Sequence, residues 1–213
     1  MKPEAPGRAC RLCPRLVAYR AQNQSSFADW HNAPVASFGG IAARLLVVGL
    51  APGLRGANRT GRPFTGDSAG DLLYRTLIET GFAVGEYDAR CDDGLRLVDC
   101  RITNAVRCVP PENKPKAAEI RQCGRFLDAE FAALGDLEAV LALGRIAHDA
   151  VLSAHGASRT AHRFGHGARH RLANDLTLFD SYHCSRYNTN TKRLTPEMFR
   201  AVVAEIRTSL SGG

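Results

Sequence analysis

The chain has 213 residues, of which 45% are hydrophobic and 23% are charged. This length and balance fit one globular domain over residues 1–213, and they exclude a disordered, collagen-like or coiled-coil protein. A net charge of +7, from 28 Lys and Arg against 21 Asp and Glu, favours a polyanionic partner such as nucleic acid, although a GC-rich coding bias would also enrich arginine.

Four strands alternate with four helices in the predicted secondary structure. The first strand, residues 44–50, is a short apolar run, and Asp67 with Ser68 can then cap a helix that stops at Gly81. There follow a strand at 95–103, a helix at 116–134, a strand at 140–143, a helix at 145–155, a strand at 176–182 and a helix that begins at Thr195. This alternation predicts a three-layer α/β/α sandwich with a central four-stranded parallel sheet.

Residues that follow parallel strands share one cleft, because the carboxyl ends of the strands meet at one edge of the sheet. The residues at these places are 49–53 with the loop to Asp67, then Asn104, Gly144, and 183–185. We therefore expect a ligand cleft lined by these segments.

The loop at 53–67 has four glycines and three arginines in fifteen residues, a composition that favours close approach of an anion such as phosphate. It is neither a Walker loop nor a Gly-x-Gly-x-x-Gly motif, which argues against nucleotide hydrolysis and dinucleotide binding. Phe64 could stack on a flat ring or plug the core. Asp67 could serve only as a helix cap, and the histidine at a strand end, His183, is equally open between function and structure.

The seven cysteines of the chain include one Cys-x-x-Cys pair, Cys10 and Cys13. A second pair, Cys108 and Cys123, flanks a Pro-rich turn that could bring both sulfurs to one point. Four such ligands suit zinc or an iron–sulfur cluster. The other three, at positions 91, 100 and 184, lack partners at ligand spacing, so we expect a single site.

Histidines recur at positions 155, 162, 166 and 170 in a Gly- and Arg-rich stretch. The sequence shows no carboxylate beside them to support a metal site, so a surface loop is the favoured interpretation over a metal site. The chain has no apolar run of the ~18 residues that cross a bilayer, and no apolar stretch follows the charges at its start. We expect a cytoplasmic, nucleoid-associated protein that is a monomer without membrane attachment.

Four ordered segments at the predicted strand ends resemble the uracil-DNA glycosylase superfamily, and most closely its family 5. They are residues 49–53, 61–67, 103–115 and 181–189. The resemblance covers residues 10 to about 195. It implies an α/β/α sandwich with a [4Fe–4S] cluster held by Cys10, Cys13, Cys108 and Cys123.

The resemblance also implies a reaction, in which uracil is flipped out of duplex DNA and its N-glycosidic bond is hydrolysed to leave an abasic site. By similarity, Asp67 would orient or deprotonate the attacking water, and His183 would donate a hydrogen bond to the departing base anion. Phe64 would stack on the base and Asn104 would bind its edge. The base-binding set also includes Gly49, Ala51 and Gly53.

The polar loop after His183 would enter the duplex and grip phosphates. The expected DNA-binding residues are Arg59, Arg62, Ser185, Arg186, Tyr187, Asn188, Lys192 and Arg193.

Two positions depart from related patterns. Leu50 stands where family 4 carries an acidic residue, so Asp67 must activate the water if any side chain does, and acceptance of hypoxanthine and other damaged bases is implied. Cys184 replaces the proline usual after this histidine. Two other functions stay open, namely a non-catalytic nucleic-acid-binding module around a metal–thiolate core and a hydrolase of small nucleosides.

Overall fold

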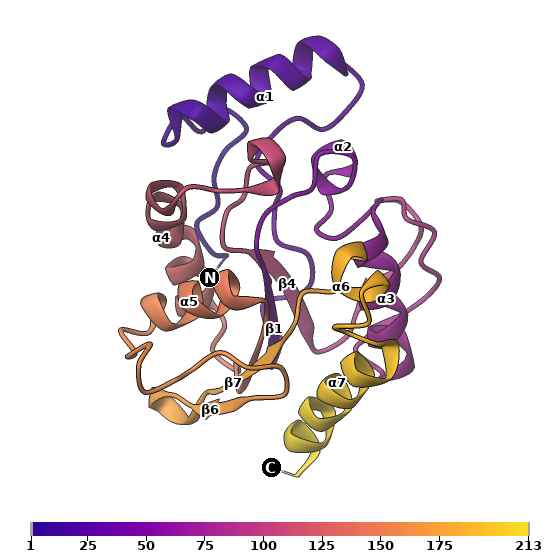
Figure 1. The fold of residues 1–213 in the computed structure, drawn as a ribbon, viewed down its shortest axis with the longest axis vertical. Coiled ribbons are helices and arrows are strands. Elements are labelled where there is room, and N and C mark those ends of the chain that lie inside the picture. The colour runs from indigo at the N-terminus through magenta and orange to yellow at the C-terminus, as the bar shows by residue number, and fades with distance from the viewer. Residues whose placement is uncertain (1, 213) are drawn as a thin grey trace.

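A computed structural model describes residues 2–212, and its centre is a mostly parallel sheet with helices on both faces (Figure 1). The strand order in the sheet is β4 (Cys100–Asn104), β1 (Leu45–Gly49), β5 (Ala139–Leu143), β7 (Thr177–Ser181) and β6 (Arg169–Arg171). The first four are parallel to one another, whereas β6 runs antiparallel to β7. The predicted α/β/α architecture is confirmed, with this fifth strand added at one edge.

The helices of the described chain have the following bounds: α1 (Pro14–Ser26), α2 (Ala57–Thr60), α3 (Ser68–Glu79), α4 (Ala117–Ala133), α5 (Arg145–Ala154), α6 (Arg186–Asn190) and α7 (Pro196–Ser211). Helices α4 and α5 pack together on one face of the sheet, and α3 and α7 pack together on the other (Figure 1). Short 3-10 turns lie at Pro111–Asn113 and Ala173–Asp175. None of the described helices is long and apolar enough to cross a membrane.

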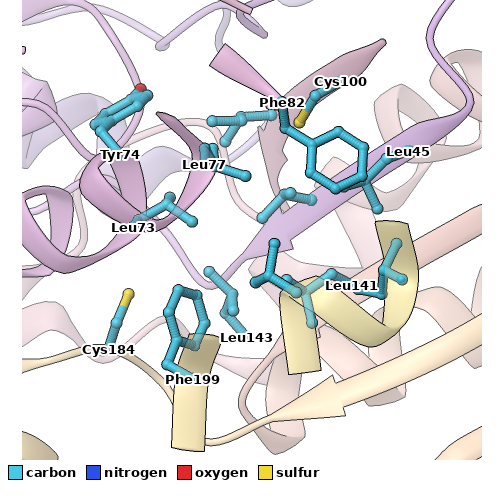
Figure 2. Packing of buried hydrophobic residues seen from close by; sticks show 14 of the residues in the cluster. Leu45, Leu73, Tyr74, Leu77, Phe82, Cys100, Leu141, Leu143, Cys184 and Phe199 are labelled. Carbon is cyan, nitrogen blue, oxygen red and sulfur yellow. The ribbon is translucent and has the colours of Figure 1, made fainter. Parts of the chain in front are cut away.

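Alternation along β1, an interior strand of the sheet, supplies side chains to both layers. Leu45 and Val47 belong to the core under α3 and α7, whereas Leu46 and Val48 belong to the core under α4 and α5. All five residues of β1 are buried, which is why the strand reads as a continuous apolar run in the sequence. Figure 2 shows the first of these cores, where leucines of the sheet meet those of α3 and Phe199 of α7.

The predicted strand at 95–103 is wrong in its length, because the structure breaks it in two. Its first part, β3 (Arg96–Leu97), pairs with β2 (Ala83–Val84) in a separate two-stranded sheet, and its second part is β4. Between them Asp99 has a φ of 54°, a left-handed conformation that ends a strand. Its carboxylate accepts hydrogen bonds from the backbone and guanidinium of Arg44, at 2.7–3.0 Å.

A third, smaller core lies beyond the main sheet, where α1 joins the Pro-rich loop and α4. Leu16 of α1 packs there with Val106, Phe126, Cys108 and Cys123. The sequence did not predict α1, although Pro14 stands at its first turn, where proline is well tolerated. This small core ties the N-terminal segment to the layer of α4.

Candidate active site and cysteine cavity

A cavity of about 380 Å³ opens at the carboxyl ends of β1 and β4, where the predicted cleft was expected. The two strands lie side by side there, with Gly49 in register with Asn104. The lining residues are Leu50, Ala51, Pro52, Gly53, Ala57, Phe64, Asp67, Ser68, Ala69, Asn104, Asn113, His183, Ser185 and Arg186. Three parts of the sequence, within residues 50–69, 104–113 and 183–186, therefore converge on one site.

Asp67 caps helix α3 and also lines the cavity. Its Oδ1 accepts the backbone N–H groups of Ala69 at 3.1 Å and Gly70 at 3.3 Å. Its Oδ2 faces the glycines of the loop, since a Cβ on Gly53 would lie 2.9 Å from it and one on Gly56 would collide with it. The two interpretations of Asp67 are thus compatible, because one oxygen serves the cap and the other faces the loop.

Phe64 belongs both to the core and to the cavity wall. It is 7% exposed, and its ring centroid lies 5.9 Å from that of His183 in a stacked arrangement. Gly49 does not itself line the cavity but lies directly behind it, because a Cβ there would collide with the Phe64 ring and with Asn104 Oδ1. The glycine at the end of β1 thereby allows both side chains to sit at the edge of the sheet.

Asn104 presents an amide to the cavity that the protein does not use fully. Its Oδ1 is buried and has no hydrogen-bond partner among residues 2–212. Buried polar atoms are nearly always paired, so an orphaned one in a cavity wall indicates a place for a ligand or a water.

His183 follows β7 and is half-buried at the cavity. Burial lowers its pKa, although the nearby Asp67 carboxylate acts in the opposite direction. The imidazole is therefore neutral at pH 7 and can donate one N–H. The backbone carbonyl of His183 accepts a hydrogen bond from Asn188 Nδ2 at 2.8 Å, which fixes the turn into α6.

Sequence reasoning missed Asn113, which reaches the cavity from the Pro-rich loop between the two cysteines. It is exposed and has a φ of 56°, and its neighbour Glu112 has the same value. Asparagine tolerates this region better than most residues. The Asn-Lys-Pro sequence marks a turn, but nothing in the pattern shows that the turn folds back over the end of β1.

The segment after His183 forms the short helix α6 rather than an irregular loop. The polar residues at the start of this helix lie at the cavity. Ser185 and Arg186 line the cavity, and Tyr187 is 72% exposed. Lys192 and Arg193 are exposed beyond the helix, and the Arg193 guanidinium lies 4.4 Å from the ring centroid of Tyr182. Arg59 of α2 is also exposed, and it does not line the cavity.

The structure corrects the expectation that Arg62 contacts DNA. Its guanidinium is 6% exposed and makes two hydrogen bonds to the Asp93 carboxylate, at 2.7 and 2.6 Å. A buried arginine that is fully paired has no free donors for a phosphate. This pairing holds the pKa of Asp93 down at about 2, although burial acts to raise it.

Four cysteines from three segments line one small cavity next to the third core. They are Cys10, Cys13, Cys108 and Cys123. The guanidinium of Arg20, a buried residue of α1, donates to Cys108 Sγ at 3.0 Å, and the backbone N–H of Arg107 donates to Cys123 Sγ at 3.3 Å. The Arg20 guanidinium also donates to the backbone carbonyl of Cys10 at 2.7 Å, so it joins the two cysteine segments beside the sulfurs. This donor set fits an anionic metal–thiolate group.

The histidine stretch folds around a carboxylate that the sequence did not reveal. His148 and His170 both lie at hydrogen-bond distance from Asp180, at 2.8 and 3.3 Å. The second ring nitrogen of His148 lies 2.9 Å from the carbonyl oxygen of His162. Although burial opposes it, the bond to Asp180 raises the pKa of His148. Both nitrogens of His148 are thus engaged, which favours a structural hydrogen-bond network over a metal site.

Comparison with known proteins identifies the family of this chain. Residues 36–207 match the family model described as the uracil DNA glycosylase superfamily. The chain is 46% identical over 205 residues to a type-5 uracil-DNA glycosylase of Thermus thermophilus, covering 93% of each chain. It is 42% identical to a type-5 uracil-DNA glycosylase of Mycobacterium bovis, covering 93% of this chain and 77% of the relative. A type-4 uracil-DNA glycosylase of Thermotoga maritima is 36% identical over 110 residues, about half of each chain. The chain therefore belongs to the uracil DNA glycosylase superfamily, with the type-5 enzymes as its relatives over most of its length.

Proposed function

We propose that the chain removes uracil from duplex DNA by hydrolysing its N-glycosidic bond, with Asp67 and His183 as the catalytic residues. The observation that carries this proposal is the single cavity in which Asp67, His183, Phe64 and Asn104 meet. A base must leave the helical stack before its glycosidic bond is accessible, and a cavity of about 380 Å³ accommodates one flipped base. The product is a free base and an abasic site.

Base recognition falls to Phe64 and Asn104. The Phe64 ring offers a flat apolar face for stacking, and Asn104 offers an unpaired amide for the hydrogen-bonding edge of the base. The main chain at Ala51 and Gly53 completes the wall, and Gly49 supports it from behind.

The chemical step uses the two catalytic residues at opposite ends of the bond that breaks. The free Oδ2 of Asp67 orients or deprotonates the attacking water and stabilises positive charge on the sugar. The neutral imidazole of His183 donates a hydrogen bond to the base as negative charge develops there. The cavity is lined by no lysine among residues 2–212, which supports direct hydrolysis without a Schiff-base intermediate.

Contacts to the DNA backbone come from exposed cationic side chains. These are Arg186, which lines the cavity, Lys192 and Arg193 just after α6, and Arg59 of α2. The exposed ring of Tyr187 is suited to filling the space that a flipped base leaves. Ser185 adds a polar contact beside the cavity, while Asn188 supports the turn from within.

The substrate range is proposed to extend to hypoxanthine and other deaminated bases. Leu50 lines the cavity and offers no water-activating side chain there, so we expect a weaker demand for one particular base. A monomeric, single-domain protein associated with the nucleoid is the form in which we expect this activity.

The four cysteines are proposed to hold a [4Fe–4S] cluster that fastens the N-terminal segment to the Pro-rich loop and α4. Four cysteines that line one cavity, with N–H donors to two of the sulfurs, support this proposal, and a single zinc ion is the alternative. When bound, the cluster supplies structural crosslinking, and no step of the hydrolysis passes through it.

The test is cleavage of end-labelled duplexes that carry one uracil, one hypoxanthine or neither. Strand breaks at the modified base only after alkali treatment are the expected result, because an abasic site is stable until then. Free deoxyuridine should remain intact, since backbone contacts are absent. Binding to modified and unmodified DNA alike, without any abasic product, would instead favour a non-catalytic binding module.

A further inference from the structure

Phe64 occupies a backbone conformation that a bulky residue rarely adopts. The four residues Arg62 to Thr65 form a tight turn, closed by a 3.2 Å hydrogen bond from the Thr65 N–H to the Arg62 carbonyl. Pro63 stands second in this turn, and Phe64 stands third with a φ of 53°. A turn with proline second and positive φ third normally places glycine at the third position. The rest of the structure must therefore hold Phe64 in place.

Two phenol hydroxyls hold the carbonyl groups of this turn. The Tyr74 hydroxyl donates to the Pro63 carbonyl at 2.6 Å, and the Tyr87 hydroxyl donates to the Phe64 carbonyl at 3.2 Å. Burial raises the pKa of Tyr87 to about 12, so the hydroxyl keeps its proton at neutral pH. Gly70 of α3 leaves room for this contact, because a Cβ there would collide with the Phe64 carbonyl and the Tyr87 hydroxyl.

The two tyrosines are themselves fixed by the buried ion pair beneath the turn. Their rings stack with centroids 4.7 Å apart, and the Arg62 guanidinium lies 5.3 Å and 5.8 Å from the two centroids. Asp93 holds that guanidinium through both carboxylate oxygens. Tyr74 belongs to the packed core of α3, as Figure 2 shows, whereas Tyr87 is half-buried on the loop that follows β2.

The other side of Phe64 faces the base-binding cavity. Its ring edge lies against the main chain at Gly49, and its face is stacked near the His183 ring. A return of Phe64 to negative φ would rotate its carbonyl away from Tyr87, and its Cβ direction would change with the backbone. The position of the ring in the cavity is thus coupled to the hydrogen bond behind it.

We propose that Tyr87 is a positioning residue for the glycosylase reaction, because its hydroxyl holds Phe64 in the conformation that presents the ring to the flipped base. Tyr87 does not touch the base, and it acts only through Phe64. The inference rests on the proposed role of Phe64 in base stacking.

The experiment is a double-mutant cycle on the purified full chain. Single-turnover cleavage of a uracil duplex is measured over a range of protein concentrations for the wild type, Tyr87→Phe, Phe64→Ala and the double variant. The Tyr19→Phe variant, which removes a phenol hydroxyl on α1 outside the turn, is the matched control. The concentration dependence separates the maximal rate from DNA binding, and the amplitude reports the folded fraction.

Loss of one hydrogen bond should lower the maximal rate of Tyr87→Phe by roughly five- to tenfold, with unchanged amplitude and half-saturating concentration. Tyr19→Phe should match the wild type. In the Phe64→Ala background, Tyr87→Phe should have no further effect, because the ring that it positions is gone.

Three results would overturn the inference. In the first, Tyr87→Phe cleaves at the wild-type rate although Phe64→Ala is slow. The stacking role of Phe64 would then remain, and the positioning role of Tyr87 would be wrong. Another is an equal loss from Tyr87→Phe in both backgrounds, which would mean that the hydroxyl acts by another route. A wild-type rate for Phe64→Ala would remove the stacking role and the positioning role together.

Discussion

One carboxylate oxygen of Asp67 accepts the backbone N–H of Ala69 at 3.1 Å, and the other oxygen lies outside this helix cap. The cap holds the carboxylate in a fixed orientation at the first turn of α3. Because one oxygen caps the helix and the other is proposed to act on the attacking water, substitutions that keep the cap and remove the second role can separate the two.

The Asp67→Asn variant should lose catalysis and keep its stability. Asparagine is as good a helix cap as aspartate, so the melting temperature should stay within a few degrees of the wild type. It cannot accept a proton from water, and we expect the single-turnover rate on uracil duplex to fall by ~10²–10³. Asp67→Ala should show the same loss of rate and, in addition, a loss of about 1 kcal/mol in the free energy of unfolding. Full activity of Asp67→Asn would exclude a water-activating role.

The pH dependence of the rate should report the neutral form of His183. Burial lowers the pKa of His183 below the ordinary 6.5. The imidazole is therefore neutral at pH 7, and it gains a proton only when the pH falls below 6.5. A protonated His183 would attract the nearby Asp67 carboxylate away from the attacking water, so the rate should be level above pH 7 and should fall as the pH drops through the lowered pKa. Single-turnover rates of the wild type and His183→Gln from pH 5 to pH 8 check this.

The glutamine variant keeps an N–H donor but does not titrate, so we expect a rate lower by about 10–100-fold and a loss of the His183 inflection. His183 also affects the free energy of unfolding. Because its pKa is lower in the folded state, its stabilising contribution is complete above pH 6.5 and is lost as the pH falls. A rate that rises on acidification would contradict the assignment of a neutral donor.

Most of the sheet could be predicted from the sequence because its central strands are short, buried on both faces and followed by turn residues. The break before β4 could not, because it depends on the left-handed conformation of Asp99 and its pairing with Arg44, 55 residues away. The edge strand β6 could not either, since its Arg-His-Arg sequence has no apolar pattern and pairs through backbone groups with β7.

Most of the predicted cavity residues lie in segments that follow parallel strands, and this explains why a topological rule identified them, although Gly144 does not line the cavity. Asp67, Phe64, Asn104 and His183 all line the cavity. Arg62 lies in the same loop, but its side chain turns inward because Asp93 and a cage of aromatic rings receive it. Whether an arginine side chain is buried or exposed thus depends on a partner such as Asp93, which the local sequence does not reveal.

Loss of a cysteine from the sulfur-lined cavity should remove iron and destabilise the protein. Cys108→Ser takes away one of the four sulfurs and the acceptor of the Arg20 hydrogen bond. We expect the purified variant to lose bound iron and visible absorption, and its melting temperature to fall by about 10 °C. Cys91→Ser is the matched control, because Cys91 is exposed and lies outside the cavity. One bound zinc in a colourless wild-type protein would replace the cluster proposal with a zinc site.

Substitution of Arg186 should weaken DNA binding, whereas substitution of Arg62 should lower stability, although both arginines lie in predicted DNA-binding loops. Arg186 is exposed at the cavity mouth, so Arg186→Ala should weaken binding to duplex DNA and reduce the slope of log K against log salt by about one. Its melting temperature should match that of the wild type.

Arg62→Ala leaves the Asp93 carboxylate buried without its partner, since the Asp93 side chain is only 1% exposed. Breaking a buried pair in this way costs about 3–5 kcal/mol of unfolding free energy. Denaturant unfolding and salt-dependent DNA binding, measured on both variants, check the contrast. The contrasting result is an Arg62→Ala variant that folds stably and shows a smaller salt slope of DNA binding. The Arg62 guanidinium would then leave Asp93 to bind phosphate, and the buried pairing would not describe the DNA-bound protein.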